Sequence, residues 1–380
     1  MAGSAENAPT WRSSFPAMGT RVDIIGWGGD GMAIVNAVVG IVARHEDMWS
    51  VFRPSSEVSQ LNATVRDAAR GDGTSCCGSD SAQAGPGLVV SEETDRLLRD
   101  ALALAEATGG AFNPLIGPLV AAWDVKAMRA AYVAGAPLPP APAADAVEAA
   151  SRASSWGLLS RVGEQRWAMG VPAESVGGVD VASPRLDLGG IAKGYTADAC
   201  RDLAVSMGAR GVLVSVGTSS VSVFGTRADG SSWRAGLRDP HGGPTSVAGV
   251  VELPAGGMSS LSTSGDNLGP LGGVGVGCAA ERAAESTSDR RARETPRETS
   301  VGGGRVFDHH IIDPRTGYPA HAGVRQVSVV ASSGVLAEAL STALLVDPSI
   351  DVPDVVARWA RVTGAPASAK VVGLVRAAQG

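Results

Sequence analysis

The segment LDLGGIAKGYTAD at residues 186–198 carries the strongest local structural signal in this 380-residue chain. Its spacing predicts a short strand that ends at Asp187, a turn with two glycines, and a helix that begins near Lys193. Glycines at such a turn let the backbone approach a ligand closely, and a helix N-terminus beside a lysine favours an anion. An ordinary tight turn with a solvated lysine explains the same spacing, so both interpretations stay open.

The patterns on either side of this segment predict the other helices and strands. Apolar residues at helical spacing indicate helices at 32–49, from the N-cap Ser91 to the glycine pair 109–110, at 194–207, and at 335–346. Short alternating runs indicate strands at 212–216, 221–225, 233–238, 247–253, 309–312 and 324–331. Because consecutive strands are joined by turns, we expect an α+β fold with a mainly antiparallel sheet flanked by helices.

Two segments have no hydrophobic period and are expected to be mobile inserts. They are residues 66–87 and 266–305, which are rich in Gly, Ser, Ala and Arg. Such segments bury too little apolar surface to offset the entropy of ordering them. We expect the remainder to form one domain over 11–347, with residues 348–380 as a helical and strand extension of it.

Composition narrows the class of protein. There are 32 Lys and Arg against 38 Asp and Glu, a formal net charge of −6, which argues against binding to nucleic acid. No apolar run approaches the ~18 residues that would span a bilayer. The four cysteines match neither a disulfide framework nor a zinc site. The N-terminus lacks an export signal and a lipobox cysteine, so a cytoplasmic location is expected.

A second polar segment, DHHIIDPRTGYP at 308–319, is dense in titratable groups. His309 and His310 alternate on a short predicted strand, and Asp313 opens the turn that follows. Polar turns of this kind often line a functional site. The alternative is a turn in which the Asp313 carboxylate bonds to its own backbone.

A third segment, AEALST at 337–342, lies on the predicted final helix. Glu338 and Thr342 are four residues apart, so a carboxylate and a hydroxyl share one helix face. Hard cations take oxygen ligands of this kind, although a solvated helix face carries the same pattern.

Taken together and in order, these segments resemble the ApbE family of FAD:protein FMN transferases. The resemblance covers nearly the whole chain apart from the inserts. It rests on AMGTRVDI (17–24), WSVFRPSSEVSQLN (49–62), ATGGAFNPLIGPLVAAW (107–123), LDLGGIAKGYTAD (186–198), LVSVGTSSVSVFG (213–225), WRAGLRDP (233–240), LSTSGD (261–266), HHIIDPRTGYPA (309–320) and SVVASSGVLAEALSTALLV (328–346).

The resemblance implies a fold and an activity. Members of the family cleave FAD with the help of Mg²⁺, attach FMN through a phosphoester to a Thr or Ser of an acceptor flavoprotein, and release AMP. Some members instead hydrolyse FAD to FMN and AMP. A flavin-binding protein with little catalysis is a third reading. The implied partners are therefore FAD and an acceptor flavoprotein, with no membrane span.

The resemblance also implies roles for individual residues. FAD contacts fall on Met18, Phe52, Ala111, Phe112, Asn113, Asp187, Lys193 and Ile312. The metal site falls on the backbone oxygen of Gly190 and on the side chains of Glu338, Ser341 and Thr342. A base for the acceptor hydroxyl is expected at His310 or at an acidic neighbour of the metal, which makes His310 and Glu338 the catalytic candidates.

The sequence departs from the family pattern at three places near this site. Glu338 replaces the usual Asp, Asn113 and Leu115 replace an Asp and a Thr, and residues 217–220 replace a Gly-Gly-Asp turn with one residue more. A longer carboxylate fits the strict Mg²⁺ shell less well, so weaker metal binding is expected.

Overall fold

The computed structural model describes residues 9–69, 87–134, 136–172, 182–240, 242, 246–253, 258–265 and 310–376. The expectation that 66–87 is an insert was wrong at its start, because residues 66–69 form the last turn of helix α2 (Glu57–Ala69). Residues 70–86, the whole of the insert predicted at 266–305, and His309 lie outside the described residues.

A seven-stranded sheet forms the centre of the described structure, and every strand in it pairs antiparallel with its neighbours. The predicted α+β fold with a mainly antiparallel sheet is therefore confirmed. In spatial order its strands are β1 (Thr10–Ala17), β2 (Thr20–Trp27), β6 (Gly211–Val216), β7 (Ser220–Gly225), β10 (Met258–Gly265), β11 (Val324–Ala331) and β12 (Ala369–Arg376).

One face of this sheet is covered by a hairpin of β8 (Trp233–Arg238) and β9 (Val247–Leu253). Their apolar side chains form a small core with residues of β6, β7 and β10, namely Leu213, Val223, Trp233, Leu237, Leu253 and Leu261. A separate three-stranded sheet contains β3 (Leu88–Val89), β5 (Arg166–Met169) and β4 (Leu159–Gly163).

Helices cover the other face of the large sheet. Helix α7 (Ala192–Ser206) packs on β6 and β7, and α8 (Gly334–Val346) packs on β10 and β11. Helix α1 (Gly31–Trp49) lies against α7. Of the residues of α8, all but Thr342 are buried, as expected of a helix that is apolar on nearly every side. The predicted helices at 32–49, 194–207 and 335–346 are confirmed within two residues at each end.

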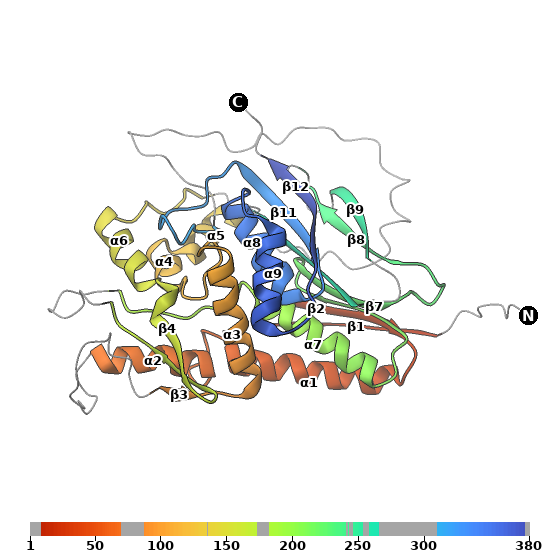
Figure 1. The fold of residues 1–380 in the computed structure, drawn as a ribbon. Coiled ribbons are helices and arrows are strands. Elements are labelled where there is room, and N and C mark those ends of the chain that lie inside the picture. The colour runs from red at the N-terminus through yellow and green to blue at the C-terminus, as the bar shows by residue number, and fades with distance from the viewer. Residues whose placement is uncertain are drawn as a thin grey trace, which may run out of the picture.

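The remaining helices form a layer beside the sheet (Figure 1). Helix α3 (Glu92–Ala107) begins as predicted at Ser91, whose Oγ accepts the Thr94 N–H at 3.3 Å. After α3 come α4 (Gly117–Ala122), α5 (Val125–Ala134), α6 (Ala144–Ala153) and the 3₁₀ turn η1 (Trp156–Leu158). Helix α9 (Val352–Thr363) packs on α3, and β12 then completes the large sheet. Among the described helices, none combines the length and apolar character needed to cross a bilayer.

Two predicted strands are absent from the described residues. Leu186 lies in no sheet, because the side chain of Asn62 takes the place of a neighbouring strand. Its Oδ1 accepts the Leu186 N–H at 2.7 Å, and its Nδ2 donates to the Leu186 carbonyl at 3.0 Å. Of the strand predicted at 309–312, only an isolated bridge between Ile312 and Pro319 exists.

Candidate functional site

The centre of the candidate site is the crossing of α7 and α8, where two glycines meet. A Cβ atom added to Gly194 would lie 2.3 Å from the carbonyl oxygen of Gly334, and one added to Gly334 would lie 2.3 Å from that of Gly194. No real side chain tolerates such a contact. The two glycines therefore let the helix backbones touch, which brings the first turn of α7 against the first turn of α8.

Glu338 lies at this crossing with 4% of its surface exposed. Its Oε2 accepts the backbone N–H of Gly194 at 2.8 Å, and its Oε1 accepts a short hydrogen bond from the hydroxyl of Ser220. The Nζ atom of Lys193 lies 3.7 Å from Oε1 and donates to the Gly189 carbonyl at 2.6 Å. A buried carboxylate is stable when charged and neutral donors surround it in this way.

A group of hydroxyls continues from Glu338 along α8 and the adjacent strand β10. Ser341 Oγ lies 2.8 Å from Ser264 Oγ and 3.2 Å from Ser262 Oγ, and Thr342 Oγ1 lies 3.1 Å from Ser264 Oγ. Their oxygens are of the type that Mg²⁺ and Ca²⁺ prefer. Among the described residues, no group of three or more His, Cys, Asp or Glu side chains is placed to hold a metal ion.

The glycine turn before α7 packs against the segment that follows α3. Asp187 N–H donates to the Pro114 carbonyl at 2.8 Å, and its Oδ1 accepts the Gly189 N–H at 2.8 Å. A Cβ on Gly190 would come within 3.3 Å of the Phe112 ring. The fold thus brings together three of the predicted site residues, Asp187, Gly190 and Phe112, from distant parts of the chain.

Other predicted FAD residues differ in how accessible they are. Ala111, Phe112 and Asn113 are 2%, 3% and 8% exposed. The amide of Asn113 is engaged internally, since its Nδ2 donates to the Ser154 carbonyl and its Oδ1 accepts the Leu115 N–H. Phe52 is 81% exposed. Met18 has a positive φ of 51° and donates its N–H to Glu46 Oε2 at 3.1 Å.

Residues 310–319, the described part of the DHHIIDPRTGYP segment, form a tight turn rather than a strand. Asp313 accepts the N–H and the guanidinium of Arg315, whose Nη1 also donates to Asp347 at 2.8 Å. Hydrogen bonds from Ser349 and Arg315 lower the pKa of Asp347 to about 2. Ile312 is buried in an apolar cluster with Leu119 and Trp123. The predicted turn, in which the Asp313 carboxylate bonds to the backbone that follows it, is confirmed. His310 is half-buried, two residues before Ile312.

Comparison with known proteins decides the family. The model of the ApbE family matches residues 18–269 and 296–363 of the chain. The chain belongs to the ApbE family.

Relatives in the family include three proteins named FAD:protein FMN transferase. The one from Treponema pallidum (strain Nichols) is 32% identical over 322 residues, which cover 83% of this chain and 71% of that protein. The one from Rhodobacter capsulatus is 28% identical, and the match covers 92% of this chain and 54% of that protein. The one from Salmonella typhimurium (strain LT2) is 29% identical, and the match covers 68% of this chain and 60% of that protein.

Solved structures of the family share the fold. The flavin transferase ApbE from Vibrio cholerae superimposes with a TM-score of 0.63 at 21% identity, covering 98% of both chains. The ApbE protein of Thermotoga maritima gives a TM-score of 0.63 at 24% identity, covering 97% of both chains.

Sequence reasoning missed several polar residues of this ApbE-family site. Ser220, Ser262 and Ser264 bond to α8 side chains, and Ser222 and Ser260 bond to Asp198 of α7. The sequence does contain a pattern that indicates them, because serines at alternate positions of β7 and β10 point toward one face of a sheet. That face is covered by α7 and α8, so these serines lie at a buried sheet–helix interface.

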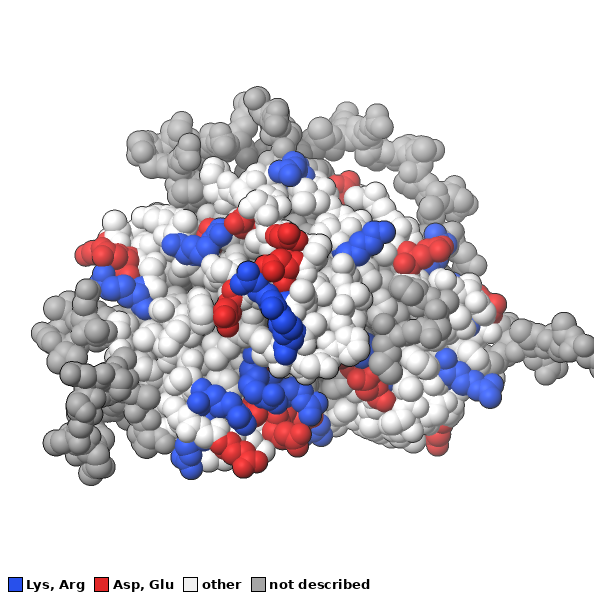
Figure 2. Space-filling view, viewed as in Figure 1, with Lys and Arg blue, Asp and Glu red and all other residues white. Residues whose placement is uncertain are grey.

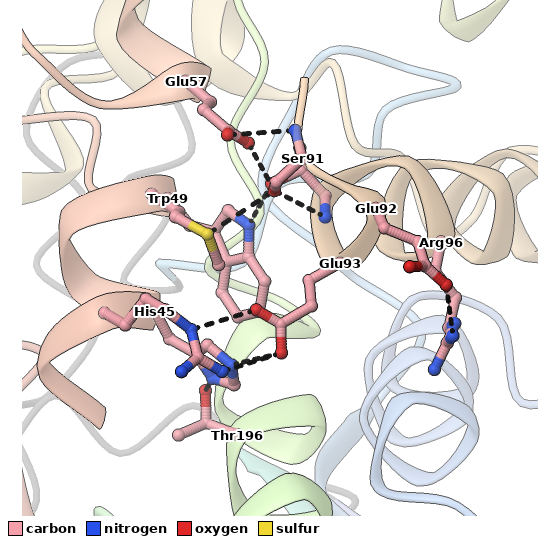
Figure 3. Close-up of polar contacts among 11 residues, drawn as sticks. His45, Trp49, Glu57, Ser91, Glu92, Glu93, Arg96 and Thr196 are labelled. Atoms are coloured by element: carbon pink, nitrogen blue, oxygen red, sulfur yellow. Dashed lines mark hydrogen bonds and ion pairs between the residues drawn. The ribbon is translucent and has the colours of Figure 1, made fainter. Parts of the chain in front are cut away.

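A second polar cluster, drawn in Figure 3, fixes α7 from the side of α1 and α3. His45 is fully buried, and its Nδ1 lies 2.9 Å from Thr196 Oγ1. Because Thr196 donates its own proton to the Ala192 carbonyl, Nδ1 must be the donor. Nε2 then faces Glu93 Oε1 at 3.6 Å, and Glu93 is held by Arg44. Burial lowers the pKa of His45 to about 4, against the opposing effect of Glu93.

The charged surface around these helices is mixed. On the face in Figure 2, acidic and basic side chains lie close together in small groups rather than in one field of a single sign. Several form ion pairs within a helix, such as Arg96 with Glu92 and Arg358 with Asp354. Exposed pairs of this kind contribute little stability.

Proposed function

We propose that this chain transfers FMN from FAD to a Thr or Ser hydroxyl of an acceptor flavoprotein and releases AMP. The observation that carries the proposal is the contact of Lys193 with Glu338 between α7 and α8, together with the hydroxyls of Ser264, Ser341 and Thr342 that gather further along α8. A lysine and a helix N-terminus favour phosphates, while oxygen donors favour a hard cation. Membership in the ApbE family and the names of its relatives support the same reaction.

The proposed FAD contacts are those expected from the sequence. Lys193 and the N-terminal end of α7 would hold the pyrophosphate, since an ammonium group and the positive end of the helix dipole both stabilise negative charge. Exposed Phe52 offers an aromatic face for a flat ring. The remaining contacts are Met18, Ala111, Phe112, Asn113, Asp187 and Ile312. Of these, Asp187 belongs to the glycine turn that leads into α7.

The proposed metal is Mg²⁺, held by the Gly190 carbonyl and by the side chains of Glu338, Ser341 and Thr342. The donor set fits this ion because each ligand is an oxygen, and the hydroxyls lie within 3.2 Å of one another or of β10 serines. When bound, the metal would neutralise charge that develops on the phosphoryl oxygens. Lys193 would stabilise the same charge from the side of α7.

A base must accept the proton of the acceptor hydroxyl, and we propose His310 for this role. An imidazole is suited to proton transfer near neutral pH. Glu338, the other candidate, already accepts hydrogen bonds at both oxygens from Gly194 and Ser220. Its carboxylate is therefore less available as a base than an imidazole at the start of the turn.

Because both oxygens of Glu338 already accept hydrogen bonds, the structure also favours a second candidate function, a flavin-binding protein with little catalysis. A carboxylate whose two oxygens are both used by the protein must give up hydrogen bonds before it can bind a metal. FMN transfer and flavin binding differ as candidate functions in whether the protein cleaves FAD.

One experiment separates these functions. The protein is incubated with FAD and Mg²⁺, with and without a domain that bears an acceptor Thr, and AMP, free FMN and covalent flavin fluorescence are measured. The proposal expects AMP and a fluorescent acceptor only when the acceptor is present. AMP without acceptor would indicate an FAD pyrophosphatase, and bound FAD without AMP would indicate the binding protein.

A further inference from the structure

Helices α7 and α8 both begin without a side-chain cap of their own. Ile191 precedes α7 and cannot cap it, and Ser333 precedes α8 but its side chain makes no capping hydrogen bond. The first N–H groups of a helix have no partners within it and need acceptors from elsewhere. In α7 the Ala192 N–H donates to the Leu188 carbonyl just before the helix at 2.9 Å, whereas the N–H groups of Gly194 in α7 and Gly334 in α8 take acceptors from distant parts of the chain.

Each helix receives that acceptor from the other. The Gly194 N–H, in the first turn of α7, donates to Glu338 of α8 at 2.8 Å. The Gly334 N–H, the first of α8, donates to Asp198 Oδ2 of α7 at 2.7 Å. Carboxylates are favourable at helix N-termini because of the helix dipole. The two helices are thus capped reciprocally, and both caps lie at the crossing of Gly194 and Gly334.

Asp198 also connects this crossing to the sheet. Its Oδ1 accepts from Ser222 Oγ at 2.7 Å, from Ser260 Oγ at 2.6 Å and from Arg201 Nη1 at 2.9 Å. Arg201 is itself 4% exposed. All four partners of the carboxylate, including the Gly334 N–H, are donors. Only a carboxylate can accept from all of them, since an amide would turn a donor toward one of these groups.

The glycine crossing explains why such hydrogen bonds are needed. Helices usually fix their relative position by interlocking side chains. Where Gly194 and Gly334 meet there are no side chains to interlock, so backbone contact alone leaves the two helices free to slide. The caps by Glu338 and Asp198 define one position along that direction.

We propose that Asp198 is a positioning residue for the transfer reaction. Through Gly334 it fixes the start of α8, and it thereby sets where Ser341 and Thr342 lie relative to Lys193 on α7. The inference rests on the proposed function, because it assigns those α8 hydroxyls to the metal and Lys193 to the phosphates. Asp198 itself touches neither group.

The test compares Asp198→Asn with Asp202→Asn. The Asn side chain keeps the volume of Asp but replaces one acceptor oxygen by a donor and removes the negative charge that faces Arg201 in both proteins. Asp202 is one turn further along α7, pairs with the same Arg201 at 2.8 Å and is half exposed, which makes it a matched control. Three quantities are measured for each protein: the Mg²⁺ concentration for half-maximal FMN transfer, the FAD dissociation constant without Mg²⁺, and deuterium uptake of the 334–340 segment.

For Asp198→Asn we expect faster deuterium uptake in 334–340 and a rise of about tenfold in the Mg²⁺ requirement, as for the loss of a hydrogen bond to a charged group. The FAD dissociation constant should stay within about twofold, because none of the proposed FAD contacts lies on α8. Asp202→Asn should behave as the wild type. Ser260→Ala, which removes one donor, should shift the Mg²⁺ requirement in the same direction by a smaller factor.

Two results would overturn the inference. One is wild-type exchange and Mg²⁺ requirement in both Asp198→Asn and Ser260→Ala. The other is a lower melting temperature and fewer active molecules with an unchanged Mg²⁺ requirement, which is the signature of a purely structural role. If Asp198→Asn does not fold, Ser260→Ala decides by the same measurements. Absence of FMN transfer by the wild type would instead reject the proposed function, and the exchange of 334–340 would still report whether Asp198 fixes α8.

Discussion

The ammonium group of Lys193 lies 3.7 Å from Oε1 of Glu338 and donates to the Gly189 carbonyl at 2.6 Å. This contact joins the first turn of α7 to α8 across a large separation in sequence. With 27% of its side chain exposed, Lys193 is held by the protein yet accessible to a ligand. An anion that enters here meets a cation whose position is already set.

Replacement of this lysine tests its role in binding. Lys193→Ala should weaken FAD binding by about 1–3 kcal/mol, the range for losing a charge-assisted hydrogen bond. Fluorescence titration with FAD measures the dissociation constant, and Lys126→Ala, at an exposed position of α5, is the control. A wild-type dissociation constant for Lys193→Ala would show that the lysine is only a solvated surface group.

Replacement of Glu338 tests the proposed metal site. Glu338→Ala should abolish Mg²⁺-dependent release of AMP, while Glu338→Asp should keep it or improve it at limiting Mg²⁺, because a shorter carboxylate fits an octahedral shell more easily. AMP release is measured over a range of Mg²⁺ concentrations. Full activity of Glu338→Ala, or loss of activity in Glu338→Asp, would place the metal elsewhere.

The buried His45 predicts a dependence of stability on pH. Its pKa is about 4 in the folded protein, lowered chiefly by burial, against 6.5 for an exposed histidine. As the pH falls from about 6.5 to about 4, the unfolded chain binds a proton that the folded chain does not, so stability falls by roughly 3 kcal/mol. Above this window the effect is absent.

Urea unfolding at pH 7 and pH 4.5 of the wild type and of His45→Gln measures this effect. The variant should lose less stability between the two pH values than the wild type does, whatever its stability at pH 7. An equal loss in both proteins would mean that His45 does not titrate in this range.

The side chain of Asn62 predicts a large effect on stability. It accepts the Leu186 N–H at 2.7 Å and donates to the Leu186 carbonyl at 3.0 Å while only 4% exposed. Asn62→Ala should lower the free energy of unfolding by about 2–4 kcal/mol, because it leaves two buried backbone groups without partners. Denaturant unfolding measures this, with Asn36→Ala on the exposed face of α1 as the control. If Asn62→Ala lowers the free energy of unfolding by less than Asn36→Ala does, water has replaced the amide as the partner of Leu186.

Asn62 also shows which part of the fold could not be predicted from the sequence. Periodicity and capping residues located α1, α3, α7 and α8, because these signals are local. The strand expected before the glycine turn does not exist, since its partner is a side chain from α2 rather than another strand. Nothing in the spacing of residues around Leu186 reveals a contact with residue 62.

The candidate site, like the fold, was predicted only in part from the sequence. The order of motifs pointed to Lys193, Glu338 and Thr342, whereas the bond of Ser220 to Glu338 and that of Asp198 to Gly334 are evident only in the folded structure. Hydrogen bonds between distant elements leave no local period. The reciprocal capping of α7 and α8 is of this type, because each helix start looks uncapped in its own sequence.

Intact-mass measurement of an acceptor domain tests the central claim most directly. The domain is incubated with FAD, Mg²⁺ and either the wild type or Lys193→Ala. With the wild type, the acceptor should gain the mass of FMN less one water, with one AMP released for each acceptor modified. Lys193→Ala should do so more slowly at limiting FAD. An unmodified acceptor, with or without release of AMP, would contradict the proposal that this chain transfers FMN to protein.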